Sequence, residues 1–340
     1  MMKQVKSDKV RWGGKVRWGI VSTAQIGRWV FAPALRATAR GELTGVASRD
    51  RERAAAFAGD LEIPEVFASY DDLLWSDRVD AVYVPLPNSM HEEWAIRAME
   101  HGKHVFCEKP LATSREGAQR MVDAAARHGV VLMEAMVFRY HPQTLRLRRL
   151  LDAGAIGDLR HVAVHMGAPV PAGNIRWLPE LGGGALADIG CYLIEVARWA
   201  AGAEPVRVAA TWRETREGGV DSRIGLLLEF PDTVVATLFG AFDAAPVRGA
   251  HLAGSGGSLH IEQPTHPYEE SAYTLTTPRA TERVTLNNGV RAFTPALDHF
   301  HDCVLDGAAP MLANTDAIAT LRIMAAAAES ARTGRTVRLG

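Results

Sequence analysis

The 340-residue sequence has little cysteine, no long apolar run and almost no net charge. Its three cysteines, Cys107, Cys191 and Cys303, lie far apart, which argues against a disulfide framework and fits a reducing compartment. No apolar stretch approaches the roughly 18 residues of a membrane span. With 38 basic and 39 acidic residues, the chain has no global field to attract nucleic acid or an anionic membrane. We therefore expect a cytoplasmic protein with no nucleic-acid or membrane partner.

Several catalytic signatures are also missing. The sequence contains no nucleophile elbow and no Walker A loop, so acyl and phosphoryl transfer have no support. None of the twelve histidines forms an HExxH pair. His161 and His165 share one side of an expected strand, but a solvated sheet face explains that spacing better than a metal site. We expect no metal cofactor.

The order of the expected elements divides the chain into two domains, as its length also predicts. From 16 to 133, short apolar runs alternate with helical patterns, which is typical of a parallel sheet covered on both faces. From about 138, consecutive strands with glycine and proline turns predict a mostly antiparallel sheet, and two helices close the chain. We predict an α/β fold with a tail at 1–14, a parallel-sheet domain at 15–137 and an α+β domain with a large open-faced sheet at 138–340. The last helices could pack back on the first domain.

The turn after the first expected strand indicates a dinucleotide site. Ser22-Thr-Ala-Gln-Ile-Gly27 takes the place of a GxGxxG loop, although only the third glycine is present. Small residues there let backbone N–H groups reach a pyrophosphate at a helix N-terminus. An ordinary tight turn is the alternative for this segment alone, and its position in a first βαβ unit favours nucleotide binding.

The end of the second expected strand indicates which dinucleotide binds. An NAD enzyme usually places a carboxylate there for the ribose hydroxyl groups, but this chain has Ser48 and Arg49, with Arg53 one turn later. Guanidinium groups pair with a 2′-phosphate, so the segment favours NADP over NAD. We interpret Asp50 as the N-cap of the next helix.

Two longer motifs carry a family resemblance. Glu108-Lys109-Pro110 follows an expected strand, and GGGALADIGCYLIE occupies 182–195. With the turn above, they resemble the Gfo/Idh/MocA family. WGIVSTAQIG, VASRD and FRYHP are similar to its NADP-using branch, which includes dimeric dihydrodiol dehydrogenase, D-xylose dehydrogenase, 1,5-anhydrofructose reductase and sugar 3-ketoreductases. The resemblance covers about 16–336 and implies a Rossmann domain followed by an open-faced sheet domain that forms homodimers or homotetramers.

The resemblance also implies site residues, position by position. Those implied to bind the cofactor are Ser22, Thr23, Ala24, Ile26, Gly27, Ser48, Arg49, Arg53, Pro85, Leu86, Asn88, His91, Glu108, Lys109, Glu134 and Arg176. Those implied to contact the substrate are Lys109, Arg176, Asp188 and Tyr192. Ser22 and Ala24 replace glycines of the usual turn, and Tyr192 stands where many members have histidine.

The catalytic roles follow from the residue types. Asp188 and Tyr192 are four residues apart on an expected helix, so they share a face. Hydride transfer at a carbinol carbon needs a matched proton transfer at its oxygen. We assign Lys109 to polarise that oxygen and Tyr192 to exchange the proton, with Asp188 orienting a substrate hydroxyl or Lys109. The alternative, in which Lys109 is the acid/base and Tyr192 only positions the substrate, stays open.

The resemblance implies an NADP(H)-dependent oxidoreductase that acts on CH–OH groups of a pyranose or related polyol. One rival is trans-dihydrodiol dehydrogenase activity. Another is the NAD-dependent glycosidase chemistry of some members, against which Arg49 argues. A rival of a different class is a non-catalytic NADPH-binding sensor, and the presence of Lys109, Asp188 and Tyr192 together disfavours it.

Overall fold

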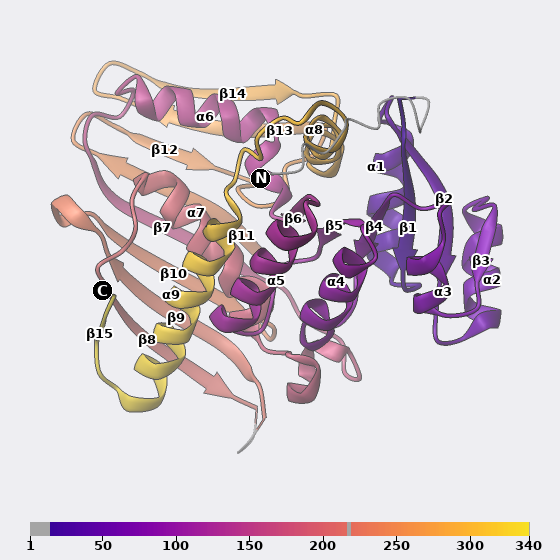
Figure 1. Cartoon of the computed structure of the whole chain (residues 1–340). Coiled ribbons are helices and arrows are strands. Elements are labelled where there is room, and N and C mark those ends of the chain that lie inside the picture. Colours follow the sequence, from indigo (N-terminus) through magenta and orange to yellow (C-terminus); the bar gives the residue numbers. More distant parts are fainter. Residues whose placement is uncertain (1–13, 216–218, 340) are drawn as a thin grey trace. The chain divides into compact units, whose positions relative to one another are not determined.

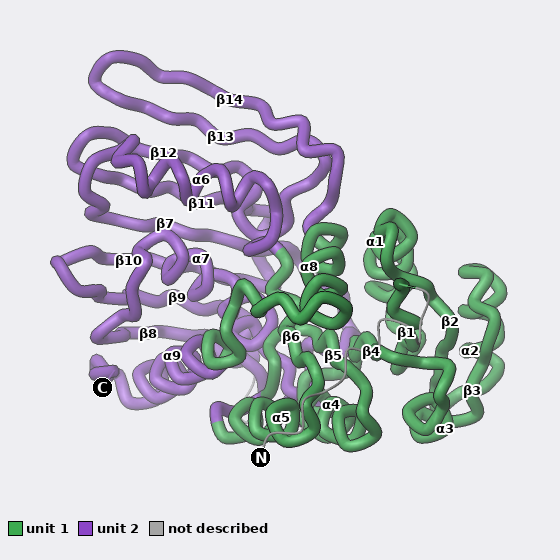
Figure 2. The backbone as a smooth tube through the Cα atoms, turned by 45° about the horizontal axis from the view of Figure 1, so that its top comes forward, with its two compact units in different colours: residues 1–112, 116–137, 293–317 green, residues 113–115, 138–292, 318–340 purple. Residues whose placement is uncertain are grey.

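The computed structural model describes residues 14–215 and 219–339, which form two compact units (Figures 1 and 2). Unit 1 contains the described residues up to Ala112, together with Glu116–Val137 and Phe293–Ala317. Unit 2 contains Thr113–Arg115, Phe138–Ala292 and the described residues from Ile318 onward. The expected tail, apart from Gly14, lies outside the described residues.

Unit 1 is built on a six-stranded sheet in the order β3-β2-β1-β4-β5-β6, with every pair parallel. This is the Rossmann strand order, in which ligands bind beyond the carboxyl ends of the strands where the order reverses, here between β1 and β4. All four positions of β4 are buried, because helices cover both faces of the sheet. The predicted parallel α/β domain is confirmed. The strands are β1 Val16–Val21, β2 Gly41–Ala47, β3 Glu65–Phe67, β4 Ala81–Val84, β5 His104–Cys107 and β6 Leu132–Glu134.

Unit 1 contains one helix that the sequence pattern did not predict, and one of the two closing helices that could pack back on the first domain. The short helix α3 follows the edge strand β3, and neither was expected. Helix α8 comes from the end of the chain, yet it packs on β1: Phe300 lies 4.8 Å from Trp18 between ring centroids, and the Trp18 indole donates to His301 at 3.0 Å. Burial lowers the pKa of His301 to about 4, so its ring is neutral and can accept this bond. The helices are η1 Gly27–Phe31, α1 Ala32–Arg36, α2 Arg51–Asp60, α3 Tyr70–Trp75, η2 Asn88–Met90, α4 His91–Glu100, α5 Arg115–His128 and α8 Phe293–Asp306.

Unit 2 is built on a nine-stranded sheet in the order β14-β13-β12-β11-β7-β10-β9-β8-β15. Only the β7–β10 pair is parallel, so the predicted mostly antiparallel sheet is confirmed. The strands are β7 Leu159–Gly167, β8 Arg207–Glu214, β9 Asp221–Glu229, β10 Val235–Ala241, β11 Val247–Gly254, β12 Ser258–Ile261, β13 Glu270–Thr276, β14 Thr281–Asn287 and β15 Val337–Arg338.

Helices α6, α7 and α9 cover one face of this sheet (Figure 1). Helix α7 contacts β7 and β10, and Ser330 of α9 accepts a hydrogen bond from the amide of Ala210 at 2.9 Å. Helix α6 reaches β13 through a hydrogen bond from Arg146 to Tyr273. The helical segments are η3 Val137–Tyr140, α6 Pro142–Asp152, η4 Ile175–Trp177, η5 Pro179–Leu181, η6 Leu186–Gly190, α7 Cys191–Ala201, η7 Pro231–Thr233 and α9 Asn314–Thr333.

The opposite face of the sheet carries no helix within the described part of unit 2. Strands β9 and β10 alternate buried and accessible positions, the pattern of a sheet packed on one side. Leu227 is 39% exposed and Phe239 is 40% exposed on this open face. His161 and His165 of β7 point to the same side as these residues. Since no described helix of unit 2 covers this side, the open-faced sheet expected from the sequence is confirmed.

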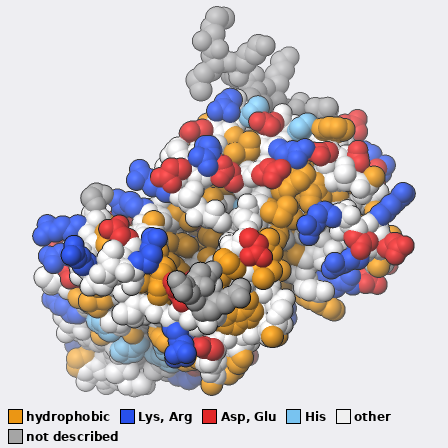
Figure 3. Space-filling model, turned by 90° about the horizontal axis from the view of Figure 1, so that it is seen from below, with side chains coloured by type: hydrophobic (Ala, Val, Ile, Leu, Met, Phe, Trp, Pro, Cys, Tyr) orange, Lys and Arg blue, Asp and Glu red, His pale blue; other side chains and the backbone are white. Residues whose placement is uncertain are grey.

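Among the described residues, no helix combines the length and the apolar character that a bilayer crossing requires. Figure 3 shows lysine, arginine, aspartate and glutamate side chains interspersed over the face in view, in keeping with the net charge of −1.

Candidate active site

The turn after β1 is held by the hydroxyl group of Ser22. The φ angle of Ser22 is +143°, in a region that favours glycine. This explains why the usual turn has a glycine at this position. The Ser22 hydroxyl donates to the Pro85 carbonyl at 3.2 Å and accepts from the Ala24 amide at 3.2 Å. Gly27 begins a π-helical turn, and a Cβ there would lie 3.5 Å from the ring of Phe57. The Ser22 hydroxyl thus holds the turn to the carboxyl end of β4, next to the end of β1.

The end of β2 presents two exposed arginines, and its one carboxylate, Asp50, serves as a helix cap. Asp50 caps α2 by accepting from the Arg53 amide at 3.0 Å, which confirms its expected role. Arg49 and Arg53 are exposed, whereas Ser48 is buried and accepts from the Asp50 amide. Burial raises the pKa of Tyr70, and the charge of nearby Arg49 offsets part of that rise. The strand end therefore has the charge that a 2′-phosphate needs.

The loop that carries Lys109 is fixed by two carboxylates. Glu108 accepts from the hydroxyl of Tyr83 at 2.6 Å and from the Lys109 amide at 3.3 Å. Glu134, at the end of β6, accepts from the Leu111 amide at 2.7 Å. Lys109 itself is half-buried. The two acidic residues expected near the cofactor thus hold the backbone on either side of Lys109.

His91 supports the same loop from behind. Its side chain is fully buried, and its two ring nitrogens lie 2.9 Å from the carbonyl oxygens of Pro110 and Leu86. Burial lowers the pKa of His91, and both carbonyl contacts oppose that change. In this arrangement His91 supports the backbone at Leu86 and Pro110. Its expected contact with the cofactor stays a prediction.

In unit 2, Asp188 and Tyr192 lie on one continuous helical segment formed by η6 and α7. Asp188 accepts from the Nε of Arg176 at 2.7 Å, and Asn174 holds the Arg176 backbone by accepting from its amide at 3.0 Å. The segment is π-helical from Leu186 to Gly190, a rare conformation that is frequent at functional sites. Three of the four expected substrate residues, Arg176, Asp188 and Tyr192, thus belong to one local structure.

The start of that helical segment is capped by a residue that the sequence analysis missed. Asp221, at the start of β9, accepts from the amides of Leu186, at 2.6 Å, and Ala185. Gly184 has a φ of +112° and packs against this carboxylate, where a side chain would collide. Burial raises the pKa of Asp221 to about 6, although the two amides act in the opposite direction. Asp221 is distant in sequence from the helix, so no local signal identifies it.

One turn after Tyr192, α7 takes part in a buried ionic network. Glu195 is fully buried and accepts from Arg139 at 2.9 Å, from Arg198 and from the hydroxyl of Thr320. Arg198 also pairs with Glu204. A buried carboxylate with two guanidinium partners and a hydroxyl is well satisfied, and loss of one partner would leave a charge uncompensated. This network fixes the helix that carries Tyr192.

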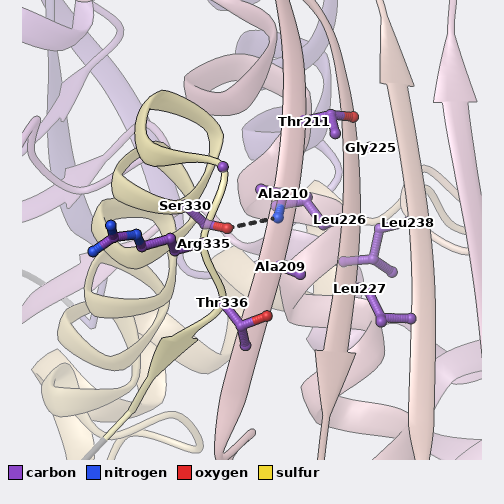
Figure 4. A pocket seen from close by; sticks show the side chains of 11 residues that line it. Ala209, Ala210, Thr211, Gly225, Leu226, Leu227, Leu238, Ser330, Arg335 and Thr336 are labelled. Carbon is purple, nitrogen blue, oxygen red and sulfur yellow. Dashed lines mark hydrogen bonds between the residues drawn. The ribbon is translucent and has the colours of Figure 1, made fainter.

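A cavity of about 460 Å³ lies elsewhere in unit 2, between β8, β9 and the segment after α9 (Figure 4). Ala210, Leu227 and Thr336 are among its lining residues, and none of the expected site residues is. The chemistry described above therefore does not belong to this cavity.

Comparisons with known proteins agree with this description. Residues 16–136 match the oxidoreductase family with an NAD-binding Rossmann fold, GFO_IDH_MocA, and residues 144–260 match the GFO/IDH/MocA C-terminal domain. The chain is 35% identical to D-xylose 1-dehydrogenase (NADP(+)) 2 of Haloferax volcanii, over 95% of this chain and 99% of that protein. It is 31% identical to trans-1,2-dihydrobenzene-1,2-diol dehydrogenase of Xenopus laevis, over 90% and 95% of the two chains.

A solved structure is also similar. It is a 3-ketoreductase from Actinomadura kijaniata in complex with NADP and TDP-benzene, with a TM-score of 0.88 and 34% identity over 93% of this chain and 98% of that one.

Proposed function

The chain belongs to the Gfo/Idh/MocA oxidoreductase family, and we propose that its site residues transfer a hydride between NADP(H) and a carbinol or carbonyl carbon of a sugar. The enzyme class and the cofactor agree with those expected from the sequence, since one relative above is an NADP(+) dehydrogenase and the similar solved structure is a 3-ketoreductase in complex with NADP. The observation that carries the proposal is that Lys109, Asp188 and Tyr192 all sit on segments fixed by polar side-chain contacts. Catalytic groups need such support to keep a productive geometry.

The residues present fit NADP. We propose that the turn from Ser22 to Gly27 receives the diphosphate at the carboxyl end of β1, and that Arg49 and Arg53 receive the 2′-phosphate. Asp50 uses one carboxylate oxygen to cap α2, so the charge that distinguishes this strand end comes from the two arginines. When bound, the nicotinamide supplies or accepts the hydride.

The protein supplies the proton transfer. Oxidation of a carbinol removes a hydride from carbon and a proton from oxygen, and reduction adds both. We assign Lys109 to donate a hydrogen bond to the substrate oxygen, and Tyr192 to accept the proton in oxidation and donate it in reduction. The reverse assignment, with Lys109 as acid/base, is the alternative.

The ion pair of Arg176 with Asp188 supports a role in substrate orientation. A carboxylate next to a hydroxylated ligand accepts hydrogen bonds from vicinal hydroxyl groups, and the Arg176 guanidinium fixes its direction. We propose that Asp188 orients the substrate hydroxyl and does not act on Lys109, because Arg176 directs the Oδ2 atom of Asp188. This arrangement suits a pyranose or a related polyol.

The test is a substrate screen with NADP⁺ and NADPH. The panel contains aldopyranoses, inositols, keto sugars and trans-dihydrobenzenediol, and nuclear magnetic resonance identifies the carbon that changes. Turnover of a sugar supports the proposal, whereas turnover of the diol alone would support the dihydrodiol dehydrogenase rival. Tight NADPH binding without turnover of any compound would instead support the sensor rival.

We also propose that the open face of the nine-stranded sheet mediates a homodimer or homotetramer. The face exposes Leu227 and Phe239 on neighbouring strands, and a flat, partly apolar surface suits a symmetric contact. Light scattering at micromolar concentration tests this, and a monomer would contradict it. A cytoplasmic location likewise stays our prediction. The three cysteines, all within the described residues, are buried and form no disulfide.

A further inference from the structure

The ring of Tyr192 has two aromatic neighbours in unit 2. Phe138 lies 6.4 Å away between ring centroids, at an interplanar angle of 55°, and His266 lies 4.9 Å away at 57°. Tyr192 is 5% exposed and Phe138 is fully buried, whereas His266 is partly exposed. Of these two rings, His266 is the nearer to Tyr192. It is also the one that is partly exposed to solvent.

The orientation of His266 is set by the residue before it. The hydroxyl oxygen of Thr265 lies 2.9 Å from Nδ1 of His266 and 3.7 Å from the sulfur of Met166 on β7. Thr265 is fully buried. A buried hydroxyl has one proton and two acceptor sites, so it can satisfy the ring nitrogen whichever tautomer is present. The contact fixes the imidazole plane against the sheet.

The segment between β12 and β13, which contains both residues, is anchored at its two ends. The side-chain amide of Gln143 on α6 donates to the carbonyl of Gln263 at 2.9 Å. Glu269 accepts from Arg291 at 2.8 Å. A loop held in this way on a rigid sheet can place a functional side chain with precision.

We propose that His266 is a positioning residue of the reaction, which holds the Tyr192 ring in the orientation needed for proton transfer, with Thr265 holding His266 in turn. This inference rests on the proposed function of Tyr192. A phenol ring turns about two side-chain bonds, so its hydroxyl moves far when one side of its packing is removed. Displacement of a reacting group by about 1 Å can cost about 10²-fold in rate.

The experiment measures kcat, KM and NADPH affinity, with the fastest substrate of the panel, for three variants. His266→Ala should lower kcat by about 10- to 100-fold. His266→Phe keeps an aromatic ring and should restore kcat to within about threefold of the wild type, because the effect depends on ring contact. His128→Ala, at an exposed end of α5, is the control for loss of a histidine. Fluorescence titration should give the same NADPH affinity in all three.

A second pair of variants tests the link without removing the ring. Thr265→Val keeps the shape of the buried side chain but loses the hydroxyl, and it should lower kcat severalfold. Thr265→Ser keeps the hydroxyl and should have close to wild-type kcat. Equal rates for these two variants would overturn the inference even if His266→Ala did not fold.

The deciding measurement is a double-mutant cycle with Tyr192→Phe. If His266 acts through the Tyr192 hydroxyl, His266→Ala should lower kcat much less in the Tyr192→Phe background than in the wild type. An equal loss in both backgrounds overturns the inference while the role of Tyr192 stands. An unchanged kcat in Tyr192→Phe alone would overturn the proposed role of Tyr192, and the role of His266 with it.

Discussion

The two sheets carry their functional residues in different ways. In unit 1, every position of β4 is buried, and the expected site residues lie at the strand ends and in the turns and helix starts that follow them. In unit 2, β9 alternates buried and accessible positions, and the site residues lie on a helical segment associated with one face. A sheet covered on both faces has only its edges and ends left for ligands, whereas a sheet covered on one face can use the helices above it.

The means of fixation differ in the same way. The Lys109 loop is held mainly through its backbone, by the carboxylates of Glu108 and Glu134. The helical segment with Asp188 and Tyr192 is held at its start in the same way, by Asp221 on the Leu186 amide, but a side-chain ionic network around Glu195 holds it as well. Changes in unit 1 should therefore act on chemistry or cofactor directly, and changes in unit 2 should also act through the stability of the helix.

The largest effect should come from Lys109→Ala. Loss of the ammonium group removes the donor proposed to polarise the substrate oxygen, so turnover should fall below detection. Affinity for NADPH, measured by calorimetry, should change little, because the proposed diphosphate and 2′-phosphate contacts lie on other turns. Lys15→Ala, at an exposed position before β1, is the control. A wild-type rate in Lys109→Ala would end the dehydrogenase assignment of this loop.

The counterpart in unit 2 is Tyr192→Phe, which removes one hydroxyl and keeps the ring. If Tyr192 is the acid/base, kcat should fall by roughly 10²–10⁴ with a small change in NADPH affinity. If Lys109 is the acid/base, kcat should stay near the wild-type value and KM for the substrate should rise. Single-turnover kinetics separates these outcomes, and Tyr268→Phe, an exposed tyrosine, is the matched control.

Much of the fold could be predicted because it depends on local patterns. The buried runs of β1 and β4 and the alternation of β9 and β10 are visible in the sequence. The edge strand β3 was missed because three residues give no periodicity. Helix α6 was missed because four of its eleven residues are Arg or Asp, and few of its positions are buried.

The site could be predicted only where a motif named it. Glu108, Lys109, Asp188 and Tyr192 belong to continuous motifs, and the structure places the last two on one helical segment. Asp221 and His266 act on that helix from other elements, and their roles exist only after the sheet has formed. Tertiary contacts of this kind leave no spacing signal in one sequence.

A smaller effect, again in unit 1, is expected for Arg49→Ala. Loss of one charge-assisted pair with the 2′-phosphate should weaken NADP binding by about 1.5–3 kcal/mol, which is about 10- to 150-fold in Kd. Affinity for NAD should stay nearly the same, because NAD has no 2′-phosphate. Calorimetry with both nucleotides measures the ratio, and Arg51→Ala provides a neighbouring exposed arginine as control. Tighter binding of NAD than of NADP by the wild type would contradict the cofactor assignment to this strand end.

The smallest effect concerns the pH dependence of stability in unit 2. Burial raises the pKa of Asp221 from 3.8 to about 6, so between these values the folded protein binds more protons than the unfolded chain. The contribution of Asp221 to the free energy of unfolding is therefore present below about pH 4 and is lost as pH rises to about 6, by up to about 3 kcal/mol. Asp221→Asn cannot titrate, so urea denaturation from pH 4 to 7 should give a flatter profile than the wild type, besides any constant offset from the altered cap. Asp232→Asn, at an exposed turn, is the matched surface substitution. Equal slopes in Asp221→Asn and the wild type would show that the Asp221 carboxylate is not a buried titrating cap. The helix of unit 2 would then not differ from the Lys109 loop of unit 1 in this respect.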